Sequence, residues 1–154
     1  MKATGIVRRI DDLGRVVVPK EIRRTLRIKE SDPLEIFTDR DGKIILKKYS
    51  PIGELGDFAK EYAQSLAQVS GYTVCIADHD QIIAASGKRA KEYAGRLIDE
   101  ELETVILNRK TVKLAKKEAV RLTQNDAGGY QSQVISVITS LGDCVGAVII
   151  FSEN

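Results

Sequence analysis

Cysteine, histidine and tryptophan are scarce in this 154-residue sequence, which contains two, one and none of them. Cys75 and Cys144 are isolated in apolar runs and show no CxxC spacing, a pattern that favours two buried, reduced thiols over a disulfide. Because His79 is the single histidine, the sequence also offers no ligand set for a zinc site. We therefore expect neither a metal nor another cofactor.

Catalytic motifs are missing as well. A single histidine with no paired base gives no candidate for general acid–base or nucleophilic catalysis. The stretch ASGKRA, residues 85–90, contains a Gly-Lys pair but lacks the spacing of a Walker loop, so we interpret it as a plain turn. The sequence therefore predicts a protein that is not an enzyme.

Long hydrophobic runs are also absent. No stretch approaches the roughly 20 apolar residues that a membrane-spanning helix needs. The opening residues, MKATGIVRRIDDLG, contain no apolar segment of a secretory signal, and acidic residues come early. We expect a cytoplasmic protein without a membrane partner.

What the sequence does contain is an uneven distribution of charge. Residues 1–48 hold 13 Lys or Arg against 8 Asp or Glu, a net charge of +5, whereas residues 49–154 hold 11 against 14, a net charge of −3. This asymmetry predicts that a polyanion would bind the first third of the chain alone. The basic residues nearest the N-terminus are Lys2, Arg8, Arg9, Arg15, Lys20, Arg23, Arg24 and Arg27.

The first thirty residues predict a hairpin followed by a short helix. Residues 4–10 and 14–18 have the apolar pattern of strands on either side of the turn sequence DDLG. Pro19 suits the first position of a helix, and Ile22 and Leu26, four residues apart, form its inner stripe. Three arginines are then expected to face outward: Arg23, Arg24 and Arg27.

A second hairpin completes this part of the chain, because residues 34–38 and 43–48 flank the turn sequence DRDG. The resulting β-β-α-β-β unit is too small to bury a stable core by itself, and the sequence supplies no disulfide or metal to hold it together. Interleaving with a second copy would build one shared core. We therefore expect a homodimer formed through residues 1–51.

A different pattern begins after the segment YSPIGEL, residues 49–55, which marks a domain junction. Helical spacing predicts a helix over 54–69 and one or two helices over 91–109, with Asp99 as a candidate N-cap. Residues 115–131 are expected to be mainly loop. The predicted strands are residues 72–78, 81–86, 133–139 and 144–151, of which the last is expected to be central.

Apolar residues define both helical regions. In the first helix the apolar residues that recur at helical spacing are Leu55, Phe58, Ala59, Tyr62, Ala63, Leu66 and Val69. In the second region the residues expected to face inward are Leu97, Ile98, Leu102, Val105 and Ile106.

The cations of the N-terminal part admit two interpretations. Arginine predominates among them, and its planar guanidinium suits phosphate oxygens, which favours a nucleic-acid partner. The alternative is a solvated surface whose charge is partly compensated by Asp11, Asp12 and Glu21. Composition alone prefers neither.

A resemblance adds weight to the first interpretation. The stretches MKATGIVRRIDDLGRVVVPKEIRRTLRI and DPLEIFTDRDGKIILKKYSP resemble the N-terminal DNA-binding domain of the AbrB family of bacterial transition-state regulators, over residues 1–51. The resemblance implies an intertwined dimer, a swapped-hairpin β-barrel in which two chains interlace. It assigns DNA binding to Arg8, Arg15, Arg23 and Arg24, with Arg9 as a further basic contact, and we add Lys2 and Lys20 from the same basic set.

The implied mode of DNA binding tolerates many sequences. The first 50 residues contain no Asn or Gln that could read adenine edges. Phosphate contacts would position the protein and duplex flexibility would select the site, as in a family that prefers flexible, AT-rich double-stranded DNA. The resemblance thus implies a nucleoid-associated transcription regulator of sporulation-type genes, with activation and repression both open.

Residues 54–154 resemble a GAF domain, a small-ligand sensor of α/β fold. The resemblance implies an effector that the sequence does not identify; Cys75 and Tyr93 are candidates to line a cavity, with core packing as the default. Such domains usually end in another helix, whereas this sequence stops at VIIFSEN, so we expect that helix to be lacking. Dimer and tetramer both stay open.

The complete expectation is an α+β protein with a DNA-binding domain over 1–51 and a GAF-like sensor and oligomerisation domain over 54–154. An antitoxin that neutralises a partner toxin is the alternative, because related swapped-hairpin proteins have that role. The long folded second half argues against it, since antitoxins usually carry a short disordered tail.

Overall fold

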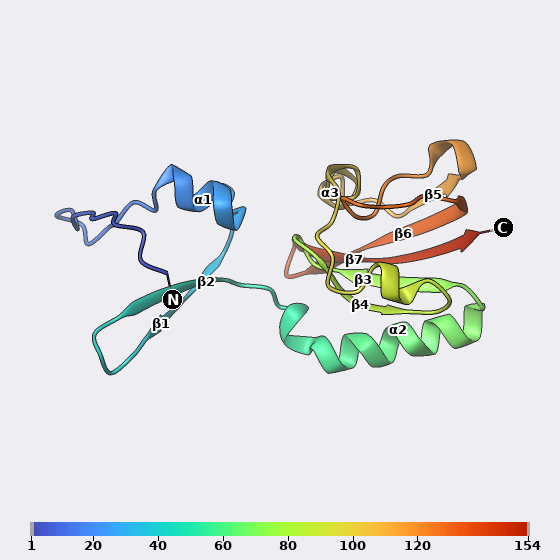
Figure 1. Ribbon diagram of the computed structural model, residues 1–154, viewed down its shortest axis with the longest axis horizontal. Helices are drawn as coiled ribbons and strands as arrows, with labels where there is room; N and C mark the ends of the chain where they lie inside the picture. Colours follow the sequence, from blue (N-terminus) through green and yellow to red (C-terminus); the bar gives the residue numbers. More distant parts are fainter. Residues whose placement is uncertain (1, 154) are drawn as a thin grey trace. The chain divides into compact units, whose positions relative to one another are not determined.

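The structure is a computed structural model that describes residues 2–153. The chain separates into two compact units, one ending at Tyr49 and the other beginning at Ser50. We describe each unit by itself. The N-terminal unit contains the helix α1 (Lys20–Leu26) and the strands β1 (Leu34–Thr38) and β2 (Ile44–Lys48), drawn in blue to cyan in Figure 1.

The strands β1 and β2 form the predicted second hairpin, paired antiparallel with Leu34 opposite Lys48. The turn is held by Asp39, whose carboxylate accepts the backbone N–H groups of Asp41 at 3.0 Å and Lys43 at 2.9 Å. Gly42 follows with a φ of +80°, a left-handed conformation that glycine adopts without a steric penalty. The sequence predicted this element because all its signals are local.

The predicted first hairpin is present only as its turn. The backbone N–H of Gly14 donates to the carbonyl oxygen of Asp11 at 3.1 Å. The backbone N–H of Asp11 donates to the carbonyl oxygen of Arg15 at 3.0 Å. The strands expected over 4–10 and 14–18 are wrong for the single chain, because residues 2–19 form no ladder in the structure. A strand needs a neighbouring strand for its backbone groups, and β1 and β2 pair only with each other.

Apolar side chains of the N-terminal unit stay largely in contact with solvent. Among residues 2–49, Pro19 is the one that is buried. The inner stripe expected on α1 is half formed, with Ile22 half-buried and Leu26 53% exposed. The other large apolar residues exposed in this unit are Ile6, Val7, Ile10, Leu13, Val16, Val17, Ile36, Phe37, Ile44, Ile45, Leu46 and Tyr49.

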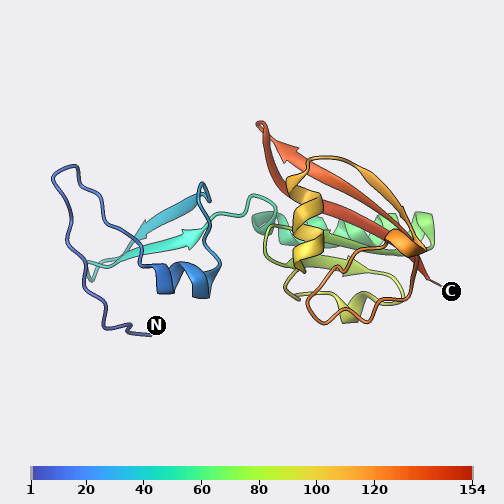
Figure 2. The ribbon, with the colours of Figure 1, turned by 90° about the horizontal axis from the view of Figure 1, so that it is seen from above.

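The C-terminal unit is a five-stranded antiparallel sheet with the order β4-β3-β7-β6-β5. The helix α2 lies on one face of the sheet and α3 on the other (Figures 1 and 2). The elements are α2 (Gly56–Ser70), β3 (Thr73–Ala77), β4 (Ile82–Ser86), α3 (Glu100–Leu107), β5 (Val112–Ala115), β6 (Tyr130–Ser140) and β7 (Asp143–Glu153), with short 3-10 helices η1 (Gly53–Leu55), η2 (Ala90–Glu92) and η3 (Lys116–Glu118).

Each face of this sheet has its own hydrophobic core. One core, on the α3 side, includes Tyr93, Leu102, Ile149 and Phe151, and the other, on the α2 side, includes Val74. Every residue of β3 is buried, and β7 is the middle strand of the order, as predicted for the last strand. A sheet covered on both faces stabilises this unit within one chain.

The helix α2 packs on the sheet through small residues. Ala59, Ala63 and Ala67 are the buried residues of the helix. The spacing of the apolar residues predicted the helix, and the structure adds that its small residues face the sheet, which lets the helix approach the strands closely and leaves the larger ones outside. The exposed apolar residues along η1 and α2 are Leu55, Phe58, Tyr62, Leu66 and Val69.

The second helical region is shorter than predicted. Asp99 caps α3, as expected, and its carboxylate accepts the N–H of Glu101 at 3.0 Å. Residues 93–99 precede the helix in irregular backbone, and Leu97, expected to face inward, is 45% exposed. The strand β5 ends at Ala115, the first residue of the region predicted as loop, and was not expected, because four residues give too short an alternation to recognise.

Both cysteines are free thiols, Cys75 fully buried and Cys144 half-buried. Burial raises the pKa of the Cys75 thiol to about 12, so it stays protonated. Tyr93 is 1% exposed and belongs to the core rather than to a cavity wall. Within residues 2–153, no helix is long and apolar enough to span a membrane.

Gly146 provides a test of the packing between β7 and its neighbours. A methyl group at this position would overlap the carbonyl oxygen of Ala77 and lie 2.8 Å from Cδ1 of Ile52. We expect Gly146→Ala to lower the free energy of unfolding of the C-terminal unit by about 3 kcal/mol, measured by chemical denaturation of the full chain. Gly56→Ala is the matched control, since nothing lies within 4 Å and the backbone is helical. Equal stability of the two variants would contradict this packing.

Candidate nucleic-acid interface

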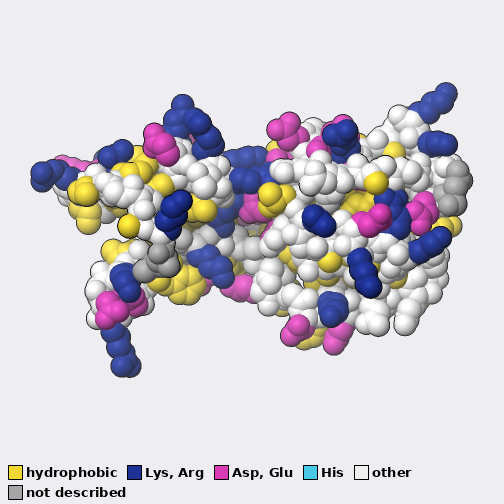
Figure 3. Space-filling view, viewed as in Figure 1, with side chains coloured by type: hydrophobic (Ala, Val, Ile, Leu, Met, Phe, Trp, Pro, Cys, Tyr) yellow, Lys and Arg dark blue, Asp and Glu magenta, His cyan; other side chains and the backbone are white. Residues whose placement is uncertain are grey.

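All seven candidate DNA-binding residues are exposed: Lys2, Arg8, Arg9, Arg15, Lys20, Arg23 and Arg24. They come from three pieces of the N-terminal unit, namely the extended segment before the turn, the turn itself and the helix α1. In Figure 3, Lys and Arg side chains project around the α1 end of this unit and at the tip of its N-terminal segment, with apolar side chains among them. Exposure leaves the cations available to an external anion.

The helix α1 carries the densest group of these cations. It begins after Pro19 with Lys20, and its last turn contains Arg23 and Arg24. The guanidinium of Arg23 donates through Nε to the carbonyl oxygen of Val18 at 3.1 Å, which orients this side chain toward the start of the helix. A guanidinium fixed at one nitrogen still presents its remaining N–H groups to a phosphate.

Arg27 differs from the sequence expectation. It was expected to face outward but is half-buried, and it closes the helix with a left-handed φ of 56°. Its carbonyl oxygen accepts a hydrogen bond from the ammonium group of Lys48 at 2.9 Å, which connects the end of α1 to the end of β2. Arg27 therefore supports the position of the helix instead of extending its basic surface.

Arg15 is held in the turn by Asp11. Its Nε donates to Oδ2 of Asp11 at 2.8 Å, and its backbone N–H donates to Oδ1 at 2.8 Å. The same Oδ1 also accepts the N–H of Leu13 at 2.9 Å. Together these bonds lower the pKa of the Asp11 carboxyl, with the backbone N–H of Arg15 as the largest cause and its guanidinium as the second.

The remaining cations lie on the extended segment before the turn. The guanidinium of Arg8 donates to the carbonyl of its neighbour Val7 at 3.2 Å. Among the described residues, no side-chain hydrogen bond or ion pair involves Arg9 or Lys2 on this segment, or Lys20 of α1. Arrays of exposed arginine and lysine of this kind can neutralise phosphate groups.

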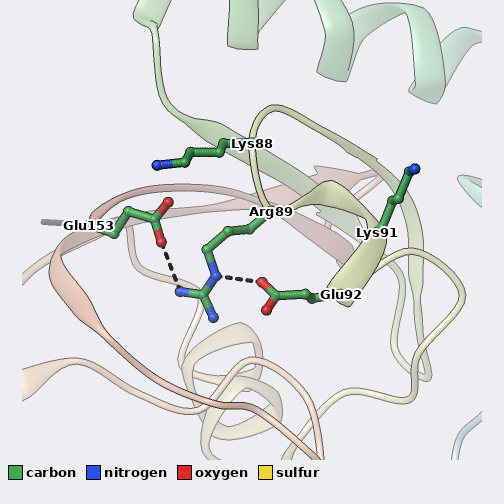
Figure 4. A pocket seen from close by; sticks show the side chains of 5 residues that line it. All are labelled: Lys88, Arg89, Lys91, Glu92 and Glu153. Atoms are coloured by element: carbon green, nitrogen blue, oxygen red, sulfur yellow. Dashed lines mark hydrogen bonds and ion pairs between the residues drawn. The ribbon is translucent and has the colours of Figure 1, made fainter.

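The C-terminal unit contains a surface hollow of about 370 Å³, shown in Figure 4 and lined by Lys88, Arg89, Lys91, Glu92 and Glu153. Arg89 lies at its centre. Its Nε contacts Glu92 at 2.5 Å, and its Nη1 contacts Glu153 at 3.2 Å and the carbonyl of Gly128 at 2.7 Å. These contacts join η2, the end of β7 and the loop before β6 at one point.

Three aromatic rings surround the same guanidinium. Its carbon lies 5.5, 5.8 and 5.7 Å from the ring centres of Tyr93, Tyr130 and Phe151. Burial opposes the charge of Arg89, but the hydrogen bond to Glu92 and the nearby carboxylates outweigh it and raise its pKa. The cluster thus holds the charged groups of Arg89 and its carboxylate partners against the hydrophobic core. Arg89 belongs to the stretch ASGKRA, which we interpreted as a turn, and its role there is structural.

No sequence signal identified this role of Arg89. Its partners are 3, 39 and 64 residues away along the chain, and none of the three spacings forms a motif. Among the described residues, no group of His, Cys, Asp and Glu could hold a metal ion.

Comparison with known proteins identifies the family. A family model described as stage V sporulation protein T C-terminal, transcription factor, matches residues 54–154. The chain belongs to this family. Stage V sporulation protein T of Bacillus subtilis (strain 168) is 56% identical over 154 residues, which cover 100% of this chain and 86% of that protein.

The N-terminal unit has its own relatives. The transition state regulatory protein AbrB of Bacillus subtilis (strain 168) is 69% identical over 51 residues, 33% of this chain and 52% of that protein. A solution structure of the N-terminal DNA recognition domain of the same regulator is 67% identical over 33% of this chain and 94% of that chain, with a TM-score of 0.28. A model of the MazE antitoxins also matches, over residues 7–54.

The predicted resemblance to the AbrB family is thereby confirmed. The chain is a transcription regulator of the AbrB and stage V sporulation protein T type and not an enzyme. It combines an N-terminal AbrB-type domain with the C-terminal domain of stage V sporulation protein T.

The contact between Asp11 and Arg15 gives a titration test. We expect the Asp11 carboxyl to titrate below its ordinary pKa, and Arg15→Gln to raise that pKa part of the way back, because the backbone N–H bond remains. Since the folded pKa is lowered, the contribution to turn stability is present above the ordinary pKa and is lost as the pH falls through the lowered one. Carbon NMR of the carboxyl group measures both values.

Asp39 is the internal control for this titration. Its pKa is also lowered, mainly by the backbone N–H of Lys43, and it should not respond to Arg15→Gln. An ordinary pKa at Asp11 in the wild-type chain would show that the turn does not form in solution.

Proposed function

We propose that the chain regulates transcription by binding double-stranded DNA through residues 1–51, with Arg8, Arg9, Arg15, Arg23, Arg24, Lys2 and Lys20 as the contacts. The observation that carries this proposal is that all seven side chains are exposed in a unit whose relative is a DNA recognition domain at 67% identity. Their charge is supplied mainly by arginine, which binds phosphate through paired N–H groups. A protein with this function works on the nucleoid in the cytoplasm.

The proposed binding is mostly to the DNA backbone. The absence of Asn and Gln from the first 50 residues leaves few groups to read bases, so selectivity would come from duplex flexibility, as in AT-rich DNA. Binding of this kind releases counterions and weakens steeply with salt. Sporulation-type genes are the proposed targets, following the relative that is 56% identical.

We further propose that the binding form is a swapped-hairpin dimer. The exposed apolar residues of the N-terminal unit support this dimer. Several of them lie in residues 4–10 and 14–18, the two segments that were expected to be strands but form none in the single chain. A second copy would provide strands for residues 4–10 and 14–18 and cover their apolar side chains. Dimerisation would also bring two sets of cations to one surface.

For the C-terminal unit we propose a GAF-like sensor role over residues 54–154. A five-stranded sheet with helices on both faces supports a module of that class. The hollow around Arg89 is lined by three cations and two carboxylates, which suit a small charged effector.

The antitoxin alternative has one observation in its favour, the match of residues 7–54 to the MazE antitoxins. A toxin partner would co-purify with the chain expressed in its own host at a fixed stoichiometry. The family match over residues 54–154 favours the transcription regulator.

The DNA-binding role is tested by replacing the two arginines of α1. If a dimer neutralises about 8 phosphates, log K should fall with log salt with a slope of roughly −7 on a flexible AT-rich duplex. We expect Arg23→Ala/Arg24→Ala to reduce that slope by about 3 to 4 and to weaken binding, as measured by fluorescence anisotropy. Lys60→Ala/Arg96→Ala removes the same charge from the C-terminal unit and serves as the control. An unchanged slope in Arg23→Ala/Arg24→Ala would show that these two arginines belong to a solvated surface and do not contact DNA.

The dimer is tested with acidic residues on the exposed apolar surface. Val7 is 83% and Val17 69% exposed in the single chain. We expect Val7→Asp and Val17→Asp each to convert the wild-type dimer to a monomer, because a carboxylate cannot be buried in a shared core without a partner. Sedimentation over a range of concentrations measures the mass. Leu141→Asp, at a hairpin tip that is fully exposed, should leave the mass unchanged, and a wild-type monomer at all concentrations would refute the shared core.

A further inference from the structure

The cations of the C-terminal half are concentrated in one short segment. Of the 11 Lys and Arg residues in 49–154, six fall within 109–121, where Glu118 is the one acidic residue. The other residues of this half carry 5 bases against 13 acids. The negative net charge of the half therefore conceals a compact basic segment.

The structure places this segment along the edge of the sheet. The strand β5 pairs with β6 and lies at the end of the strand order. Val112 and Leu114 pack against the core, so Lys113, between them, points to the opposite side and is exposed. Lys110 precedes the strand, and the lysines of η3, Lys116 and Lys117, follow it, all exposed. We call these four residues the lysine strip.

The ammonium groups of the lysine strip have no partner among residues 2–153, since no ion pair or hydrogen bond engages them there. The neighbouring Arg109 is different, because its guanidinium donates to the carbonyl of Gly142 at 2.7 Å. Arg121 contacts Glu101 through its backbone N–H, which donates to the carboxylate at 2.7 Å. The carboxylate of Glu118 accepts the N–H of Ala115 at 3.3 Å.

The surface around Lys113 contains no acidic side chain in register with it. Across the ladder it lies opposite Val134, and Ala115 lies opposite Ser132. Thr111 contacts the hydroxyl of Ser136 at 3.4 Å. Hydroxyl groups beside lysines are common phosphate contacts. Figure 3 shows Lys and Arg side chains standing out over the β5 and η3 end of the unit.

We infer that the lysine strip is a second DNA contact, which binds the phosphate backbone through the C-terminal unit. The inference rests on the proposed DNA-binding function, because a chain held on DNA by its first unit keeps its second unit at a high effective concentration of phosphate. Lysine supplies point charges that fit phosphates without reading bases. The strip spans about 20 Å at the rise of a strand, a length over which duplex DNA presents many phosphates.

A different role would explain the same lysines. Charged side chains on an edge strand prevent it from pairing with the edge of another molecule. That role predicts association of the chain when the lysines are removed, with no change in DNA binding.

The experiment compares two double variants of the full chain with the same loss of charge. The first is Lys113→Gln/Lys117→Gln, and the control is Lys60→Gln/Arg96→Gln, whose residues are also exposed and lie outside the hollow around Arg89. Anisotropy with a flexible duplex is measured from about 50 to 200 mM salt. Circular dichroism verifies the fold, and sedimentation verifies the mass.

We expect the first variant to reduce the magnitude of the salt slope by at least about 1 for each chain, and the control to leave it unchanged. An unchanged slope in the first variant, with or without new self-association, would overturn the inference, as would equal reductions in both variants. A wild-type chain that binds no DNA at low salt would instead refute the proposed function itself.

Discussion

The N-terminal unit cannot bury its apolar side chains within one chain, and the rest of the molecule depends on how that constraint is met. Among residues 2–49, thirteen large apolar residues are exposed, including Val7 and Val17 on the segments that form no strand. Burying apolar surface supplies about 25 cal/mol per Å², the main favourable term in folding. The proposed shared core between two copies would meet the constraint and bring the cations of both chains together. Assembly and DNA binding would then be parts of one equilibrium, and both would depend on concentration.

The C-terminal unit meets the same physical requirement by itself. Its central strand β7 is covered on both faces, and the last described residue of that strand, Glu153, contacts Arg89. Through the carbonyl of Gly128, Arg89 also holds the loop that precedes β6. An anionic effector in the hollow would compete with Glu92 and Glu153 for the guanidinium, so binding there would loosen the ties between η2, β7 and this loop. That gives a sensor role a specific structural consequence.

Local signals explain what the sequence predicted. The hairpin around DRDG, the cap at Asp99 and the apolar strand β7 each depend on residues close together in the chain. The sequence missed features that depend on distant neighbours. The strands over 4–10 and 14–18 lack a partner in this chain, the large side chains of α2 are displaced outward by its alanines, and the partners of Arg89 lie up to 64 residues away. The candidate cations were recognisable as residues, whereas the half-burial of Arg27 required the position of β2.

Averaging charge over a whole domain obscured the basic segment at β5. With 13 acids against 5 bases elsewhere in residues 49–154, most of this half repels a phosphate backbone. The same repulsion makes any contact through the lysine strip directional, because other orientations would bring carboxylates toward the DNA. A negatively charged unit with one basic edge can therefore be oriented on DNA by electrostatics alone, without a rigid connection to the unit that recognises it. Screening limits this effect to within about 10 Å of the surface at moderate salt, so it acts only after the N-terminal unit has bound.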